Sequence, residues 1–234
     1  MVFRESVAWR WSHTRHHTDT IIVGRDPEIA VPRPPDLLGI ALAFFGLKSA
    51  PKEFWKMCQH ACGQLTPAEV TYIPEDERPK LYRNARIYLL ILAGMTAWAI
   101  ALRSILPLMY IGLPVFYGSW MGVLFGLTEH AGLAEDVLDH RLNSRTVYLN
   151  RIARFFTWEM NYHVEHHMFP MVPYHALGKL HDEIKADMPR AHNGLWEAYR
   201  EIIPTLLRQV KDPTYHAKRE LPAHVQPVTA LEPR

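Results

Sequence analysis

The chain has 234 residues, of which 26 are Lys or Arg and 24 are Asp or Glu. A chain of this length forms one ordinary domain or a short bundle of membrane helices. Because the opposite charges nearly balance, electrostatics give no reason to expect a nucleic-acid partner.

A first histidine group lies near the N-terminus, in the segment WSHTRHH. His13, His16 and His17 have the spacing i, i+3, i+4, which places them on one face of a helix and lets them point at a common centre. Neutral imidazole is the commonest protein ligand for zinc, iron, copper and nickel. One such group is equally typical of a histidine-rich surface, so this segment alone leaves both interpretations open.

A short apolar segment, LLGIALAFFGL, follows at Leu37 to Leu47, directly after the proline-rich VPRPPD. It is too short to cross a bilayer as a helix, which takes about 20 residues. We expect it to lie flat in the membrane interface, with Phe44, Phe45 and the later Trp55 at the lipid boundary.

Both cysteines, Cys58 and Cys62, lie in the segment CQHAC on either side of His60. Two thiols and one imidazole are too few ligands for a four-coordinate zinc site. We therefore expect free thiols in a reducing compartment.

A long apolar block runs from Ile87 to Leu127 and is interrupted by one charge, Arg103. Its length of about 40 residues is roughly twice what one membrane-spanning helix needs. We expect a helical hairpin whose passes are Ile87 to Leu102 and Ile105 to Leu127, with the turn at Arg103 and Ser104. A hairpin buried in a soluble protein is the alternative.

Basic residues flank this block on both sides, and the positive-inside rule therefore places both of its ends in the cytoplasm. These residues are Arg78, Lys80, Arg83 and Arg86 before the block, and Arg141, Arg145, Arg151 and Arg154 after it. Histidine groups on either side of the hairpin can then meet on the same side of the membrane.

Two more histidine segments follow the apolar block. LTEHAGLAED places Glu129 and His130 where the second pass should leave the membrane, and NYHVEHHMFP contains His163, His166 and His167. The last three repeat the H-x-x-H-H spacing of the first group. Two identical groups among 14 histidines favour a metal site over a surface cluster.

Other catalytic motifs are missing from the sequence. HVEHH has the wrong order for a zinc protease, and there is no G-x-S-x-G, P-loop or G-x-G-x-x-G segment. The chain therefore does not supply its own nicotinamide site, and its electrons must come from a separate carrier.

The segments HTRHH, EHAGL and NYHVEHHMFP together resemble the membrane fatty acid desaturase superfamily, over about residues 9 to 185. EHAGL is similar to the hydroxylase branch in particular. The combination of EHAGLAEDVLDHRLNSRTV with the last histidine segment resembles bacterial rhizopine-catabolism oxygenases and dihydrorhizobitoxine desaturases.

The resemblance implies an all-α integral membrane helical bundle in a bacterial inner membrane, with a cytoplasmic helical cap that carries the histidines. It implies two non-haem irons, O2 as co-substrate, a lipid or hydrocarbon substrate and a ferredoxin- or rubredoxin-type electron carrier. The domain covers residues 1–211, and a loose tail follows at 212–234. The implied metal ligands are His13, His16, His17, His130, His163, His166 and His167. The carboxylates expected to accept the distal N–H of these imidazoles are Glu129, Asp139, Glu159 and Glu165.

One departure from the family pattern concerns an earlier H-x-x-x-H or H-x-x-x-x-H segment on a membrane helix, because no histidine precedes His13. We therefore expect an N-terminally truncated member with an incomplete metal site. The expected function is O2-dependent desaturation of an acyl chain or a similar lipid. The alternatives are a hydroxylase acting on a hydrocarbon or small molecule, and a non-catalytic remnant.

Overall fold

The computed structural model describes residues 3–229, which are mostly helical. They divide into two compact units. Unit 1 contains Met1–Arg15 and Leu37–Val123, and unit 2 contains His16–Asp36 and Leu124–Arg234. Helices α1 (Ser6–Thr18) and α8 (Ser119–His130) each contribute residues to both units.

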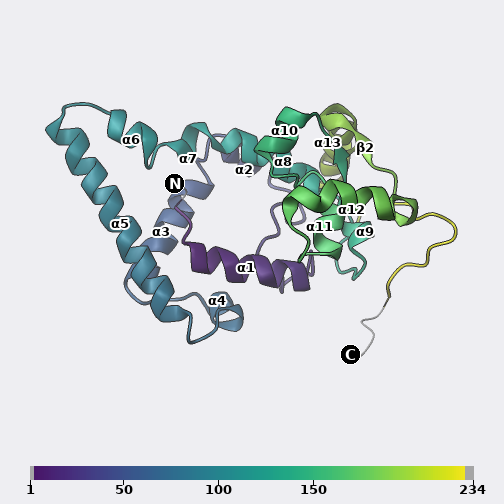
Figure 1. The fold of residues 1–234 in the computed structure, drawn as a ribbon, viewed down its shortest axis with the longest axis horizontal. Helices are drawn as coiled ribbons and strands as arrows, with labels where there is room; N and C mark the ends of the chain where they lie inside the picture. The colour runs from purple at the N-terminus through teal and green to yellow at the C-terminus, as the bar shows by residue number, and fades with distance from the viewer. Residues whose placement is uncertain (1–2, 230–234) are drawn as a thin grey trace. The chain divides into compact units, whose positions relative to one another are not determined.

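Unit 1 is built around the long helix α5, against which α3 packs (Figure 1). Its other helices are short. The bounds are α2 (Leu37–Ala43), α3 (Ser49–Ala61), α4 (Pro67–Tyr72), α5 (Arg78–Ala101), α6 (Leu106–Tyr110) and α7 (Pro114–Tyr117).

Helix α5 includes nearly all of the predicted first apolar pass and begins nine residues before it, at Arg78. Among the described residues it is the one helix long and apolar enough to cross a membrane. Most of its apolar surface is open, since Leu90 is 71% exposed and Ile100 is 72% exposed. A soluble core helix would instead bury these side chains.

The predicted second pass is wrong as one continuous helix, because residues 105–127 form α6, α7 and the first part of α8. Pro107 is the second residue of α6 and Pro114 is the first residue of α7, in the first turn of each helix, where the missing N–H of proline is tolerated. Between them Gly112 has a φ of 109°, which an L side chain rarely adopts. The described residues therefore do not show a bundle of several membrane-spanning helices.

Unit 1 also holds a buried polar network between α3 and α4. His60 Nε2 lies 3.0 Å from Glu69 Oε1, and Lys56 Nζ lies 2.8 Å from the same oxygen. Glu69 also forms a capping box with Thr66. Cys58 and Cys62, on either side of His60, are free thiols as predicted.

Unit 2 arranges short elements around α11, which packs against α9 and α12 (Figure 1). Strands β1 and β2 pair in parallel, with Val147 opposite His192. The bounds are α9 (His140–Asn143), β1 (Val147–Tyr148), α10 (Arg151–Phe156), α11 (His163–Met168), η1 (Tyr174–Ala176), α12 (Leu177–Ile184), η2 (Lys185–Asp187), β2 (His192–Asn193) and α13 (Gly194–Gln209).

The described part of the C-terminal segment, residues 212–229, contains no helix or strand. It is nevertheless attached to unit 2. Ala217 N–H donates to Gly132 O at 2.9 Å, and Val228 N–H donates to the Asp139 carboxylate at 2.9 Å.

Candidate metal centre

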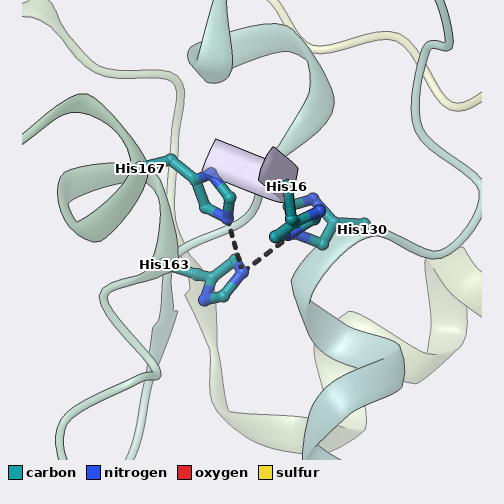
Figure 2. Close-up of side chains that lie close together, drawn as sticks. All are labelled: His16, His130, His163 and His167. Carbon is teal, nitrogen blue, oxygen red and sulfur yellow. Dashed lines mark hydrogen bonds between the residues drawn. The ribbon is translucent and has the colours of Figure 1, made fainter. Parts of the chain in front are cut away.

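Four histidines of unit 2 bring their ring nitrogens together: His16 from α1, His130 from the end of α8, and His163 and His167 from α11. One nitrogen of each lies within 4.8 Å of the others. Figure 2 shows the rings close together, with dashed lines from His163 to its neighbours. His163 Nε2 lies 2.9 Å from His130 Nε2 and 3.1 Å from His167 Nε2. We refer to these four residues as the four-histidine cluster.

Local structure explains why His163 and His167 share this centre. They are four residues apart on α11, so their side chains lie on the same face. The start of α11 is held by an antiparallel bridge between Thr146 and Tyr162. The histidine helix is therefore anchored next to the β1–β2 pair.

His130 is positioned by the turn that ends α8. Gly132 has a φ of 77°, and a Cβ at this position would lie 2.7 Å from Thr205 Cγ2. Only glycine fits such a close approach without strain. The chain can therefore turn two residues after His130 and pack against α13.

The distal nitrogens of three cluster histidines have polar partners. His16 Nδ1 lies 2.8 Å from Asp26 Oδ2, and His130 Nδ1 lies 2.8 Å from Asn143 O. Thr20 Oγ1 lies 3.0 Å from His167 Nδ1. Such partners orient a metal-binding imidazole so that its other nitrogen faces the ion.

Burial keeps three of the cluster imidazoles uncharged. It lowers the pKa of His130, His163 and His167 well below 6.5, and neighbouring imidazoles lower each of them further. Nitrogens about 3 Å apart on neutral rings direct lone pairs at one another unless a proton or a cation lies between them. His163 Nδ1 is buried and has no hydrogen-bond partner. These donors therefore fit a metal ion that binds nitrogen ligands.

The remaining predicted histidines lie next to this cluster or along the same helix. His17 Nε2 is 3.0 Å from His166 Nε2, and both residues belong to unit 2. His13 belongs to unit 1 and precedes His17 by one turn on α1.

The prediction that each H-x-x-H-H group points at one common centre needs correction. On α11, His163 and His167 join the four-histidine cluster, whereas His166 faces His17. Adjacent helical residues differ in direction by about 100°, and in this structure the nitrogens of His166 and His167 join different groups of imidazoles. Each helix therefore contributes to two neighbouring sets of imidazoles.

Three of the four predicted carboxylates have other partners in the structure. Glu165 lies 2.5 Å from His181 Nδ1 and accepts a hydrogen bond from Thr146 Oγ1, so it holds α11 against its neighbours. Asp139 pairs with Arg141, and Glu159 pairs with Arg154, each at 2.7 Å. The fourth, Glu129, lies 3.8 Å from His163 Nε2.

Sequence reasoning missed the residues that do hold the distal nitrogens. Asp26 follows His16 by ten residues and Asn143 follows His130 by thirteen, so no helical period relates either pair. Asn143 acts through its backbone carbonyl, which any residue type provides. Only the acidic Asp26, in the segment GRDPEI after the first histidine group, offered a signal in the sequence.

The family model described as "Fatty acid desaturase" matches residues 1–199 of the chain. Comparisons with curated proteins and with solved structures find no match.

Proposed function

The chain belongs to the fatty acid desaturase family, and from this premise we propose that it is an integral membrane di-iron oxidoreductase that desaturates an acyl chain or a similar lipid with O2. The four-histidine cluster carries the proposal, because its nitrogens converge on one point and three of its side chains are buried. The pKa values of His130, His163 and His167 also lie well below 6.5, which leaves these imidazoles neutral. A surface histidine cluster would be solvated and would not hold its rings by their distal nitrogens.

Both metal positions are assigned to histidines. His16, His130, His163 and His167 hold one iron, and His17 and His166, with His13 one turn earlier on α1, hold the other. When bound, the irons supply the redox chemistry that removes hydrogen from an unactivated C–H bond. The protein's own part is to orient the imidazoles, through Asp26, Thr20 and the Asn143 carbonyl.

Apolar side chains on both units support a membrane location. In unit 1 the exposed face of α5 suits lipid, as described above. In unit 2 helix α10 exposes Ile152 and Phe155, and Trp158 follows it with 63% of its surface exposed. Aromatic and aliphatic side chains of this kind are typical of a membrane interface. We assign the protein to a bacterial inner membrane, with the histidines on the cytoplasmic side.

The electron donor is a separate ferredoxin- or rubredoxin-type carrier, because the chain has no motif for a nicotinamide or flavin of its own. Hydroxylation of a hydrocarbon or a smaller molecule is the second candidate, and EHAGL around His130 favours it. Both reactions begin by removing hydrogen from carbon, so only the product distinguishes them.

The test is to purify the protein from membranes, measure its metals and supply O2, a reductase, a carrier and acyl lipids. We expect about two irons per chain, as in other di-iron helical proteins, and an unsaturated product by mass spectrometry. Zinc in place of iron would contradict the proposal, and a hydroxylated product would select the second candidate. His166→Ala should abolish turnover, whereas His175→Ala, at an exposed histidine of η1, should retain it.

A further inference from the structure

Unit 2 exposes large apolar side chains in two segments, one before and one after helix α11. Phe155 is 77% exposed in the first segment and Met171 is 91% exposed in the second. The rings of Trp158 and Tyr174 lie 5.0 Å apart, so the two segments meet. Contiguous exposed apolar patches mark sites that contact membranes or other proteins. We refer to the exposed residues Ile152, Phe155, Phe156, Trp158, Phe169, Met171 and Tyr174 as the apolar patch.

Helix α10 turns its apolar face away from unit 2. Ile152, Phe155 and Phe156 have the spacing i, i+3, i+4 and therefore share one face. All three are exposed, whereas Ala153 and Arg154 are half-buried. A surface helix of a soluble protein has the opposite arrangement, with its apolar stripe against the core. The orientation of α10 therefore suits apolar surroundings outside the unit.

The turn after α10 holds Trp158 at the surface in a strained conformation. Trp158 has a φ of 53° and Glu159 a φ of 58°. This left-handed region costs an L-residue about 1–2 kcal/mol. Arg154 fixes the turn, because its Nε lies 2.7 Å from Glu159 Oε2 and its guanidinium lies 5.3 Å from the centre of the Tyr162 ring. Such strain persists where surrounding contacts enforce it, and it is typical of functional segments.

The backbone of α10 and its turn is hydrogen-bonded internally, as contact with lipid requires. Asn150 Oδ1 accepts a hydrogen bond from Ala153 N–H at 2.9 Å. The N–H groups of residues 157–160 donate to carbonyls of residues 153–157, at 3.0 to 3.3 Å. In the second segment, Pro170 and Pro173 have no N–H to satisfy. These segments therefore present few unsatisfied donors to an apolar medium.

Charge and composition favour a phospholipid surface as the occupant of the patch. Residues 151–160 and 169–174 contain two arginines and one glutamate, which is a net charge of +1, and the glutamate is paired with Arg154. Trp and Tyr side chains are enriched at membrane interfaces, and positive charge attracts anionic lipids. A redox carrier binds transiently, through small and mostly polar interfaces, which this patch does not resemble.

We infer that the apolar patch inserts into the interface of a phospholipid bilayer, so that unit 2 contacts the membrane through a surface of its own in addition to helix α5. The inference rests on the proposed function, because it requires a membrane protein. Helix α11, which carries His163, His166 and His167, lies in the chain between the two segments that contact lipid. The arrangement suits an acyl substrate taken from the bilayer rather than from water.

Spin labels measure this insertion without turnover, because O2 concentrates in lipid whereas an aqueous nickel(II) chelate is excluded from it. The substitutions Cys58→Ser and Cys62→Ser remove both free thiols. In this background, Phe155→Cys and Met171→Cys place a label in each segment of the patch. The full chain is reconstituted into vesicles of phosphatidylethanolamine and phosphatidylglycerol, and power saturation gives the collision rates with both reagents.

Two further labels serve as controls. Leu90→Cys lies on the exposed apolar surface of α5 and reports lipid, and Asp182→Cys lies at an exposed charged position of α12 and reports water. We expect the labels at 155 and 171 to collide mainly with O2, at a depth of about 5–10 Å. The label at 182 should collide mainly with the nickel chelate.

A second measurement covers the case in which a labelled variant is unstable. Vesicles of brominated phospholipid quench tryptophans that contact lipid. The wild type should be quenched more than Trp158→Phe, because this substitution removes a tryptophan of the patch. Equal fractional quenching of the two proteins would count against insertion.

The remaining outcomes separate the inference from the proposed function. If the labels at 155 and 171 meet the nickel chelate while the label at 90 does not, the patch lies in water and the proposed membrane location stands. If the patch labels avoid both reagents and show dipolar broadening, a second copy of the chain covers the patch and the inference is wrong. If the label at 90 also meets the nickel chelate, the proposed membrane location itself is wrong.

Discussion

Both units of the chain contain a histidine that is almost fully buried, but the polar partners of the two rings differ. In unit 1, His60 is 2% exposed and contacts Glu69, which also binds Lys56, so the network contains both charges and is complete. In unit 2, His163 is 3% exposed, and its Nε2 faces the nitrogens of two other imidazoles. The partner of the ring, rather than its burial, therefore distinguishes a structural histidine from a candidate metal ligand.

The largest effect should come from replacing one buried histidine in each unit by alanine. His163→Ala should remove the metal of the four-histidine cluster and lower O2-dependent turnover by at least about 100-fold, because it deletes a direct ligand. His60→Ala should keep the metal but destabilise unit 1 by about 1–3 kcal/mol, since buried Glu69 loses a hydrogen-bond partner. Metal analysis and denaturant unfolding measure the two effects. Equal metal loss in both variants would remove the distinction between the units.

A smaller effect is expected for the carboxylate that orients His16. Asp26→Asn should weaken metal binding by about 10- to 100-fold, because an amide accepts the imidazole N–H less strongly than a carboxylate does. Chelator competition measures this change. Asp182→Asn is the control. Asp182 lies on α12, is exposed and pairs with Lys185, so its replacement should leave the metal affinity unchanged.

When the pH is lowered, the two units should lose stability over different pH ranges. In unit 2 the pKa values of His130, His163 and His167 lie well below 6.5, so the unfolded metal-free chain binds protons below pH 6.5 that the folded chain does not. The stability of metal-free unit 2 should therefore fall as the pH drops below 6.5. Bound metal should be released over the same range, because its ligands must be deprotonated.

Unit 1 should resist acid to a lower pH. Burial alone would raise the pKa of Glu69, but hydrogen bonds from His60, Lys56 and Thr66 lower it from 4.5 to about 2. The resulting stabilisation is present above pH 4.5 and is lost as the pH falls toward 2. Hydrogen exchange, corrected for its intrinsic pH dependence, should show α11 losing protection before α3 and α4. Loss of protection at the same pH in all three helices would contradict the prediction that unit 1 is the more acid-resistant unit.

The smallest predicted effect concerns the turn after His130. Gly132→Ala should destabilise the protein by about 1–3 kcal/mol, because the new Cβ would press on Thr205 at a positive φ. Gly24→Ala also has a positive φ, of 80°, but no atom lies within 4 Å, so only backbone strain of about 1 kcal/mol remains. Metal affinity should fall in the first variant alone, since Gly132 lies two residues from His130.

Helical periodicity accounts for what the sequence could predict about these sites. The i, i+4 spacing of His163 and His167 was sufficient to place both imidazoles on one face, because neighbours on a helix depend only on local geometry. The length and composition of α5 likewise predicted a membrane-length helix. Hydropathy could not show that the second apolar pass is divided into several helices, because it measures apolar character alone. The interruptions lie near Pro107, Gly112 and Pro114.

By itself, the sequence determined which residue types are present and which of them share a helical face. The tertiary structure decided how the histidines divide, with His16 assigned to the four-histidine cluster and the adjacent His17 to His166. It also decided which groups hold the rings, because Asp26 and the Asn143 carbonyl reach their histidines through loops. Helical periods carry no information about such contacts, since they depend on how distant segments fold back onto one another.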